Sequence, residues 1–277
     1  MEFIVIVVGL LLMRQLGSLS ALQRDRWFLG WLSGLRRALG RAEWLVGLLA
    51  LVVPVALLAA LVWALADRWL GVPVFIISLL AFLYALGRGD LEKEVEAYEE
   101  DLGRGDEQAA YHDIAAFTED NQPARAGNVE ESHTEAVKII AYRYFERYFA
   151  VIFWFILAGA PGALLYRLSV IYSQNGPDEG EPPGKHRWLW LLEWLPVRLV
   201  GISLAVVGNF SACLARLSES MVSSAGSADV LGAYALAASE TEVKGEDGFV
   251  AKAGIEALFT RTLIFSVFMV AVMVVLV

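Results

Sequence analysis

The stretch 44-WLVGLLALVVPVALLAALVWALA-66 decides the class of fold. It runs for 23 residues without a charged side chain, and a helix of this length, at 1.5 Å per residue, crosses the roughly 30 Å of hydrocarbon in a bilayer. The whole 277-residue chain shares this bias, since 57% of it is hydrophobic and only 19% is charged. These proportions exclude an ordinary soluble domain and predict an integral membrane protein.

Other apolar segments lie at 3–20, 69–86, 148–172, 188–208 and 257–277. Arg14 interrupts the first of them, so that segment either spans obliquely or lies at the membrane interface. The segment 148–172 contains 158-AGAPG-162, whose glycine and proline favour either a kinked span or a re-entrant hairpin. We expect an all-α polytopic membrane protein with about five to six transmembrane or interfacial helices and a helical cytoplasmic module.

The chain divides into six parts: 1–43, an N-terminal apolar helix and basic segment; 44–86, a transmembrane hairpin; 87–147, an acidic helical loop; 148–208, membrane helices with the AGAPG break and a WLPVR block; 209–256, a second helical loop; and 257–277, a C-terminal transmembrane helix. Placing 14–43, 87–147 and 209–256 in the cytoplasm puts 16 basic residues inside and three outside, as the positive-inside rule requires. Both termini then face outward, although a hairpin at 158–162 would reverse everything after it.

The loop 87–147 carries the acidity of the chain, with 16 acidic and seven basic residues. An acidic surface excludes nucleic acid and anionic lipid as its partners and suits a protein partner.

The sequence GRGD occurs twice in the loop 87–147, at 87–90 and 103–106. No strand precedes either copy and no Gly-Lys-Ser/Thr follows. We therefore interpret both copies as sites where one helix ends and the next begins, and not as phosphate-binding loops. Four apolar residues form a stripe at helical spacing: Leu91, Val95, Tyr98 and Leu102.

No catalytic residue and no metal site can be assigned from motifs. The three histidines are scattered, the single Cys213 excludes an internal disulfide, and the common hydrolase, nucleotide-binding and metalloprotease motifs are missing from the sequence. Polar side chains in or beside the apolar segments are the remaining candidates, because burying them in a membrane is costly. They are Arg198, Glu193, Arg167 and Glu146. Two interpretations stay open for Arg198: ordinary pairing between helices, with Glu146 or Glu193, or a ligand pocket.

The blocks 150-AVIFWFILAGAPGALLYRL-168 and 194-WLPVRLVG-201 resemble a superfamily of membrane proteins. It contains the adenosylcobinamide-phosphate synthases of cobalamin biosynthesis and the AmpE family, which is the closer match. The resemblance covers nearly the whole chain. It implies a bacterial inner-membrane protein, multi-pass with its main hydrophilic loops in the cytoplasm, that modulates β-lactamase induction in connection with cell-wall recycling.

Departures from the synthase pattern argue against carrying over the enzyme's activity. Lys138 and Tyr142 stand where the synthases carry acids, and 189-LWLLE-193 replaces acids ahead of their L-P-A-R sequence. ATP-driven ligation needs carboxylates that hold Mg²⁺, so we predict no cofactor, and ATP enters only by analogy with the synthases. A membrane enzyme with ligase-like chemistry on another substrate is the alternative, and a transporter is a weaker one. The bilayer is the expected partner, and a homo-oligomer is compatible with the sequence.

Overall fold

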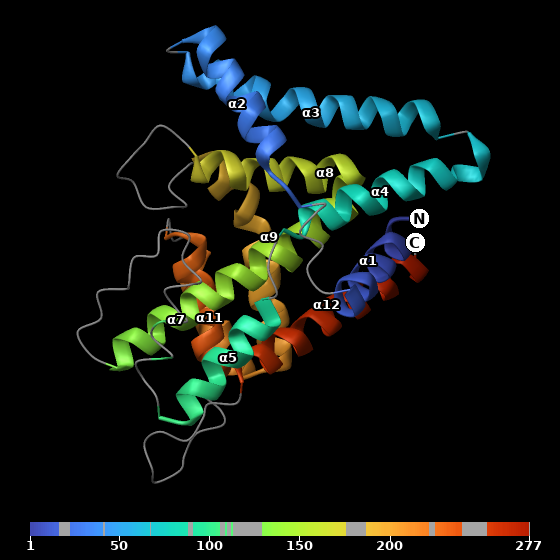
Figure 1. Cartoon of the computed structure of the whole chain (residues 1–277). Coiled ribbons are helices and arrows are strands. Elements are labelled where there is room, and N and C mark those ends of the chain that lie inside the picture. Colours follow the sequence, from blue (N-terminus) through green and yellow to red (C-terminus); the bar gives the residue numbers. More distant parts are fainter. Residues whose placement is uncertain are drawn as a thin grey trace. The chain divides into compact units, whose positions relative to one another are not determined.

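The computed structural model describes residues 1–16, 23–40, 42–66, 68–87, 91–105, 109, 112, 129–175, 187–221, 225–239 and 254–276 (Figure 1). The regular elements in these ranges are all helical, which confirms the predicted all-α class. The elements are α1 (Glu2–Leu16), α2 (Arg26–Leu39), α3 (Glu43–Leu65), η1 (Trp69–Gly71), α4 (Val72–Ala85), α5 (Leu91–Gly103), α7 (Val129–Tyr144), η2 (Phe145–Phe149), α8 (Ala150–Gln174), α9 (Arg187–Val207), α10 (Phe210–Ser220), α11 (Ser227–Ser239) and α12 (Ile255–Leu276).

Four helical stretches in the described part of the chain are long and apolar enough to cross a membrane. They are Glu43–Leu65, Thr134–Gln174, Trp188–Val207 and Ile255–Leu276, and the shorter Trp69–Ala85 is also apolar. Large apolar side chains on them face outward, including Leu57 of α3 and Phe268 of α12. Such surfaces are unfavourable in water and suit contact with lipid chains, so the polytopic membrane fold is confirmed.

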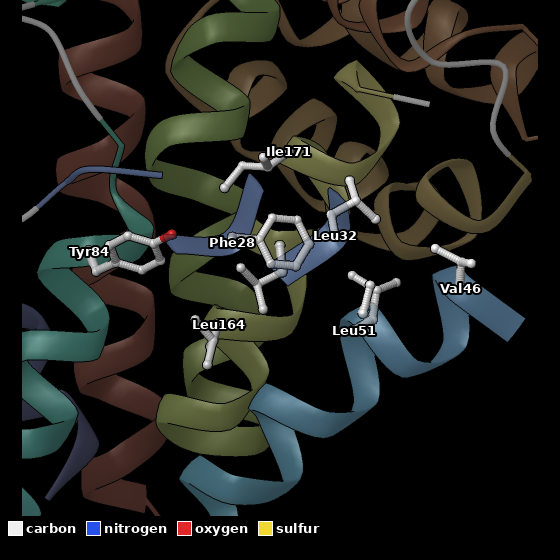
Figure 2. Packing of buried hydrophobic residues seen from close by; sticks show 9 residues of the cluster. Phe28, Leu32, Val46, Leu51, Tyr84, Leu164 and Ile171 are labelled. Atoms are coloured by element: carbon white, nitrogen blue, oxygen red, sulfur yellow. The ribbon is translucent and has the colours of Figure 1, made fainter. Parts of the chain in front are cut away.

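The chain forms two compact units, and neither is continuous in the sequence. The first unit comprises Met1–Gly89 and Ala150–Leu192. Here α4 and α3 pack on α8, α1 packs on α4, and α2 packs on α3. Figure 2 shows the core that these contacts bury, with Phe28 of α2 at its centre. The cluster consists of Phe28, Leu32, Val46, Ala50, Leu51, Tyr84, Leu164, Leu168 and Ile171.

The second unit comprises Asp90–Phe149 and Glu193–Val277. Its most extensive helix pair is α7 with α11, and α10 packs on α11 while α12 contacts α5 and α7. A Cβ atom added at Gly232 of α11 would lie 2.3 Å from Cγ of Lys138 in α7, so only glycine permits the two helices to approach this closely. Cys213 is a buried free thiol.

The AGAPG sequence produces a sharp bend in α8. Ala158 and Gly159 leave the helical conformation, and Gly159 adopts a φ of 64°. A Cβ atom added at Gly162 would lie 2.3 Å from the carbonyl oxygen of Trp154, eight residues earlier. In a straight helix those positions would be about 12 Å apart along the axis, so the chain folds back on itself here. Which side of the membrane each loop occupies stays a prediction.

Three residues of the stripe predicted in the acidic loop, Leu91, Val95 and Tyr98 of α5, are buried, and the fourth, Leu102, is partly buried. Residues 88–90 and 106–128 of the loop, apart from 109 and 112, lie outside the described residues, so the interpretation of the two GRGD sequences stays a prediction.

Candidate functional site

Pro196 leaves a gap in the hydrogen bonding of α9 that another helix fills. Proline has no N–H, so the carbonyl of Leu192, four residues earlier, lacks its usual helical donor. The indole Nε1 of Trp154 in α8 donates to this carbonyl at 3.2 Å. The costly unsatisfied carbonyl that proline would leave in an apolar setting is thereby avoided. The indole N–H of Trp154 thus takes the place of the main-chain N–H that Pro196 lacks.

Arg198 lies two residues after this proline and is 5% exposed. Its Nη1 donates to the carbonyl oxygen of Trp194 at 2.9 Å and its Nη2 donates to that of Ser220 at 2.8 Å. The guanidinium also lies over the indole of Trp194, 4.5 Å from the ring centroid. Ser220 ends α10, where carbonyls lack helical partners and carry the negative end of the helix dipole. Arg198 therefore fastens the end of α10 to α9.

A hydroxyl pair extends this contact to α11. The side chain of Ser220 also contacts the Tyr234 hydroxyl through a short hydrogen bond. Burial raises the pKa of Tyr234 above its usual range, so its phenol stays neutral at physiological pH. A Cβ atom added at Gly201 would lie 2.5 Å from the Tyr234 ring, which shows how closely α9 and α11 meet. Arg198, Ser220 and Tyr234 thus join three helices.

Glu193 binds a tyrosine of α7 that lies one turn before Glu146. Glu193 is 1% exposed and accepts a hydrogen bond from the Tyr142 hydroxyl at 2.9 Å. Glu146 follows Tyr142 by one turn of the same helical stretch. It belongs to the π-helical turn Phe145–Phe149, a rare geometry that often marks functional positions. Glu193 is therefore bound to the tyrosine of α7 that lies one turn before Glu146.

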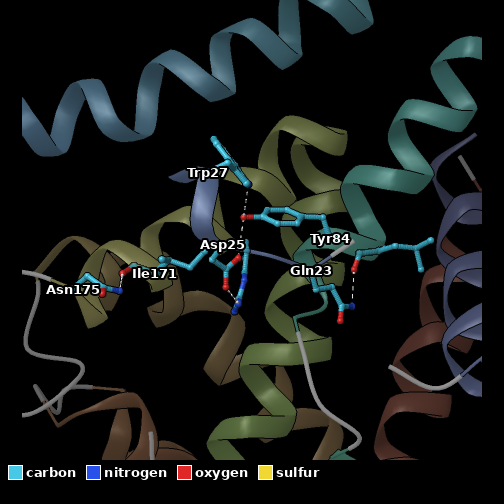
Figure 3. A network of polar contacts seen from close by, with 8 residues as sticks. Gln23, Asp25, Trp27, Tyr84, Ile171 and Asn175 are labelled. Carbon is cyan, nitrogen blue, oxygen red and sulfur yellow. Dashed lines mark hydrogen bonds and ion pairs between the residues drawn. The ribbon is translucent and has the colours of Figure 1, made fainter. Parts of the chain in front are cut away.

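Arg167 takes part in a separate network in the first unit, and Figure 3 labels three other members of it, Asp25, Tyr84 and Trp27. Its Nη2 lies 3.0 Å from Oδ2 of Asp25, and both side chains are largely buried. The Tyr84 hydroxyl donates to Oδ1 of Asp25 at 3.0 Å and accepts from Nε1 of Trp27 at 3.1 Å. Asp25 occupies the N-cap position of α2, yet its side chain makes no capping hydrogen bond. Its carboxylate is instead used to hold α8 and α4.

Gln23 fixes the segment before α2 in the same network. It is 1% exposed, and its Nε2 donates to the carbonyl oxygen of Leu83 at 3.0 Å. The bond ties the start of α2 to the end of α4, beside the buried hydroxyl of Tyr84. This contact supports the position of Asp25 two residues later.

The structure thus places the four predicted residues in three settings. Within the described residues Arg198 has no carboxylate partner, and its Nη1 and Nη2 bind main-chain carbonyls instead. Sequence reasoning missed Asp25, Tyr84 and Trp154 as partners. Asp25 offered a signal, since it is one of only two acids in the basic segment 14–43. In the described part of the chain, no three His, Cys, Asp or Glu side chains converge so that they could hold a metal ion.

Comparison with known proteins identifies one family and two similar proteins. A family model described as "Regulatory signalling modulator protein AmpE" matches residues 7–276. A protein from Chromobacterium violaceum named "Cobalamin biosynthesis protein CobD" is 29% identical over 154 residues, covering 53% of this chain and 47% of that protein. One of the same name from Stutzerimonas stutzeri is 38% identical over 66 residues, 22% of each chain. The chain thus spans less than half the length of the curated relatives it matches. No solved structure matches.

Proposed function

The chain belongs to the AmpE family of regulatory signalling modulators, and on this premise we propose that it modulates β-lactamase induction in connection with cell-wall recycling. In this proposal it is a multi-pass protein of the bacterial inner membrane with its main hydrophilic loops in the cytoplasm. It acts by transmitting a conformational change and without catalysis.

The observation that carries this proposal concerns Lys138 and Tyr142, the two positions where the synthases that it resembles carry acids. Lys138 lies 3.3 Å from a carboxylate oxygen of Asp229 in α11 and 3.4 Å from one of Glu135. Tyr142 donates to Glu193. Both side chains are engaged in packing α7 against its neighbours, which suits a structural use of positions that hold carboxylates in the enzymes.

The acidic helix α5 offers a route for a signal. Its exposed side includes Glu92, Glu94 and Glu96, which suit a partner with a basic surface. On the same helix, Glu99 accepts a hydrogen bond from the main-chain N–H of Glu256, at the start of α12. A partner that moves α5 would therefore act directly on the end of an apolar helix.

The test measures β-lactamase induction in a strain that lacks the gene and carries plasmid-borne variants. We expect wild-type protein to restore the parental induction ratio and Glu96→Lys, on the exposed side of α5, to restore it only in part. Glu219→Lys is the matched control, because it reverses one exposed charge on α10. Unchanged induction and unchanged muropeptide levels after deletion would contradict the regulatory role. Equal restoration by both variants would contradict the part assigned to α5.

A membrane enzyme with ATP-dependent, ligase-like chemistry is the second candidate, and the similarity to the two cobalamin biosynthesis proteins favours it. Binding of ATP to the purified chain tests it, with Arg198→Ala as the variant and Arg216→Ala, an exposed arginine of α10, as the control. ATP binding that Arg198→Ala abolishes would favour the enzyme. Failure to bind ATP, or binding that neither substitution changes, would count against it.

A further inference from the structure

Helix α2 has an apolar side that is fully used inside the first unit. Phe28 and Leu32 are 0% and 2% exposed, and Leu35 and Leu39 pack against the same core cluster. These four residues recur at intervals of three and four, which places them on one face of the helix. The opposite face of the helix carries exposed side chains.

That opposite face is basic. Arg26 and Arg37 are exposed and lie 11 positions apart, which is three turns or about 16 Å along the helix. At 100° per residue they point the same way and lie opposite Phe28 and Leu32. Arg24, just before the helix, is exposed as well.

The acids nearest to this face in the sequence are bound elsewhere. The segment 14–43 has two acids, and Asp25 is held in the buried pair with Arg167. Glu43 lies 3.8 Å from Nε of Arg36, the least exposed of the arginines in α2. Within the described residues, Arg24, Arg26 and Arg37 have no carboxylate partner. The exposed arginines of α2 thus form a basic face in a chain whose net charge is −9.

Two tryptophans border the basic face. Trp27 and Trp31 are 47% and 37% exposed and lie one turn apart, between the buried and the basic sides of α2. Indole rings favour the headgroup level of a bilayer, where one part of the ring is in apolar surroundings and the N–H is hydrated or bonded. The Trp27 N–H is bonded to Tyr84, so its ring is held at this border.

We propose that α2 is a binding surface for anionic phospholipid headgroups. The phosphate groups of such lipids meet Arg26, Arg37 and Arg24, while Trp27 and Trp31 lie at the level of the glycerol backbone. A basic helix edged with tryptophan is suited to this surface, whereas a basic protein or a zwitterionic membrane would be repelled or weakly held. The inference does not depend on the proposed regulatory role.

The test titrates the full-length protein in a neutral detergent with phosphatidylglycerol and follows its thermal unfolding. Phosphatidylglycerol should raise the unfolding temperature, and phosphatidylcholine or inorganic phosphate at the same concentration should not. Each arginine near an anionic surface changes binding about fivefold, so Arg26→Gln/Arg37→Gln should raise the half-saturating lipid concentration about 25-fold. Arg104→Gln/Arg216→Gln removes two exposed arginines elsewhere and should leave it within about twofold of wild type.

Two results would overturn the proposal: a wild-type response to phosphatidylglycerol in Arg26→Gln/Arg37→Gln, or an equal response to inorganic phosphate. If that variant fails to fold, wild-type protein in rising salt gives an independent answer. Raising the ionic strength from about 0.1 to 1 M shortens the screening length from about 10 to 3 Å, so the response should fall sharply. A response that salt does not change would also overturn it.

Discussion

Glu99 of α5 accepts a hydrogen bond of 3.0 Å from the main-chain N–H of Glu256, so a helix of the acidic segment caps the N-terminus of α12. The first N–H groups of a helix have no partner within the helix, and a carboxylate there also interacts well with the helix dipole. A Cβ atom added at Gly254 would lie 2.5 Å from Oε2 of Glu99, so glycine leaves room for this carboxylate.

Substituting Glu99 should change how stability depends on pH. Burial raises the pKa of Glu99 above the ordinary 4.5, with the Glu256 carboxylate adding to the effect and the main-chain hydrogen bonds opposing it. The folded protein then holds this proton more tightly than the unfolded chain. The free energy of unfolding therefore increases as the pH falls from neutral through the raised pKa toward 4.5. Glu99→Gln, which keeps an oxygen acceptor, should remove this contribution.

Thermal unfolding in detergent across this pH range measures the effect of Glu99→Gln. Glu100→Gln, at the next and exposed position, is the control and should keep the wild-type slope. Identical slopes for the two variants would show that Glu99 does not titrate as proposed.

The pair of Asp25 and Arg167 should behave as a strongly coupled unit. Asp25→Asn alone leaves a largely buried guanidinium without its anion and should lower the free energy of unfolding by about 3 kcal/mol. Arg167→Gln should have a similar effect. The double variant should cost less than the sum of the two by roughly 1–3 kcal/mol, because neither charge is then left alone. Unfolding by SDS titration, followed by circular dichroism, gives the three values, and strictly additive costs would refute the coupling.

Arg198 should prove to be a structural anchor between helices. Arg198→Ala loses the bond to the Ser220 carbonyl and the stacking on Trp194, and we expect a loss of roughly 2–3 kcal/mol in unfolding free energy. Arg198→Lys keeps the charge but not the planar fork, and should recover only part of this. Arg216→Ala, on the exposed side of α10, should leave the unfolding temperature unchanged. An Arg198→Ala protein as stable as wild type would contradict the anchoring role.

The helices could be predicted from the sequence, but the contacts between helices could not. A charge-free run such as 44–66 can satisfy its backbone in a membrane only as a helix, so length and composition predict it. The AGAPG sequence left two outcomes open, because the sharp bend depends on the φ of Gly159, which glycine permits but does not require. The side of the membrane on which the later loops lie depends on that bend.

The contacts of the site residues could not be predicted for a different reason. Asp25 and Arg167 are 142 positions apart, and nothing periodic in the sequence relates them. Arg198 binds main-chain carbonyl groups, which every residue carries. The identity of the residue at position 220 therefore does not indicate that its carbonyl is the partner of Arg198. Buried polar side chains could be identified by their cost, but helix packing decides which groups satisfy them.

The last prediction uses the pairing of Trp154 with Pro196 across α8 and α9. Trp154→Phe keeps the aromatic bulk but removes the donor to the Leu192 carbonyl, and an unsatisfied carbonyl at this place should cost about 1–3 kcal/mol. Pro196→Ala in the same background restores a main-chain N–H four residues after Leu192 and should recover most of that loss. In the wild-type background Pro196→Ala should gain less, because Trp154 already occupies the carbonyl. SDS unfolding of the four proteins checks this order, and equal effects of Pro196→Ala in both backgrounds would show that the indole does not replace the missing bond.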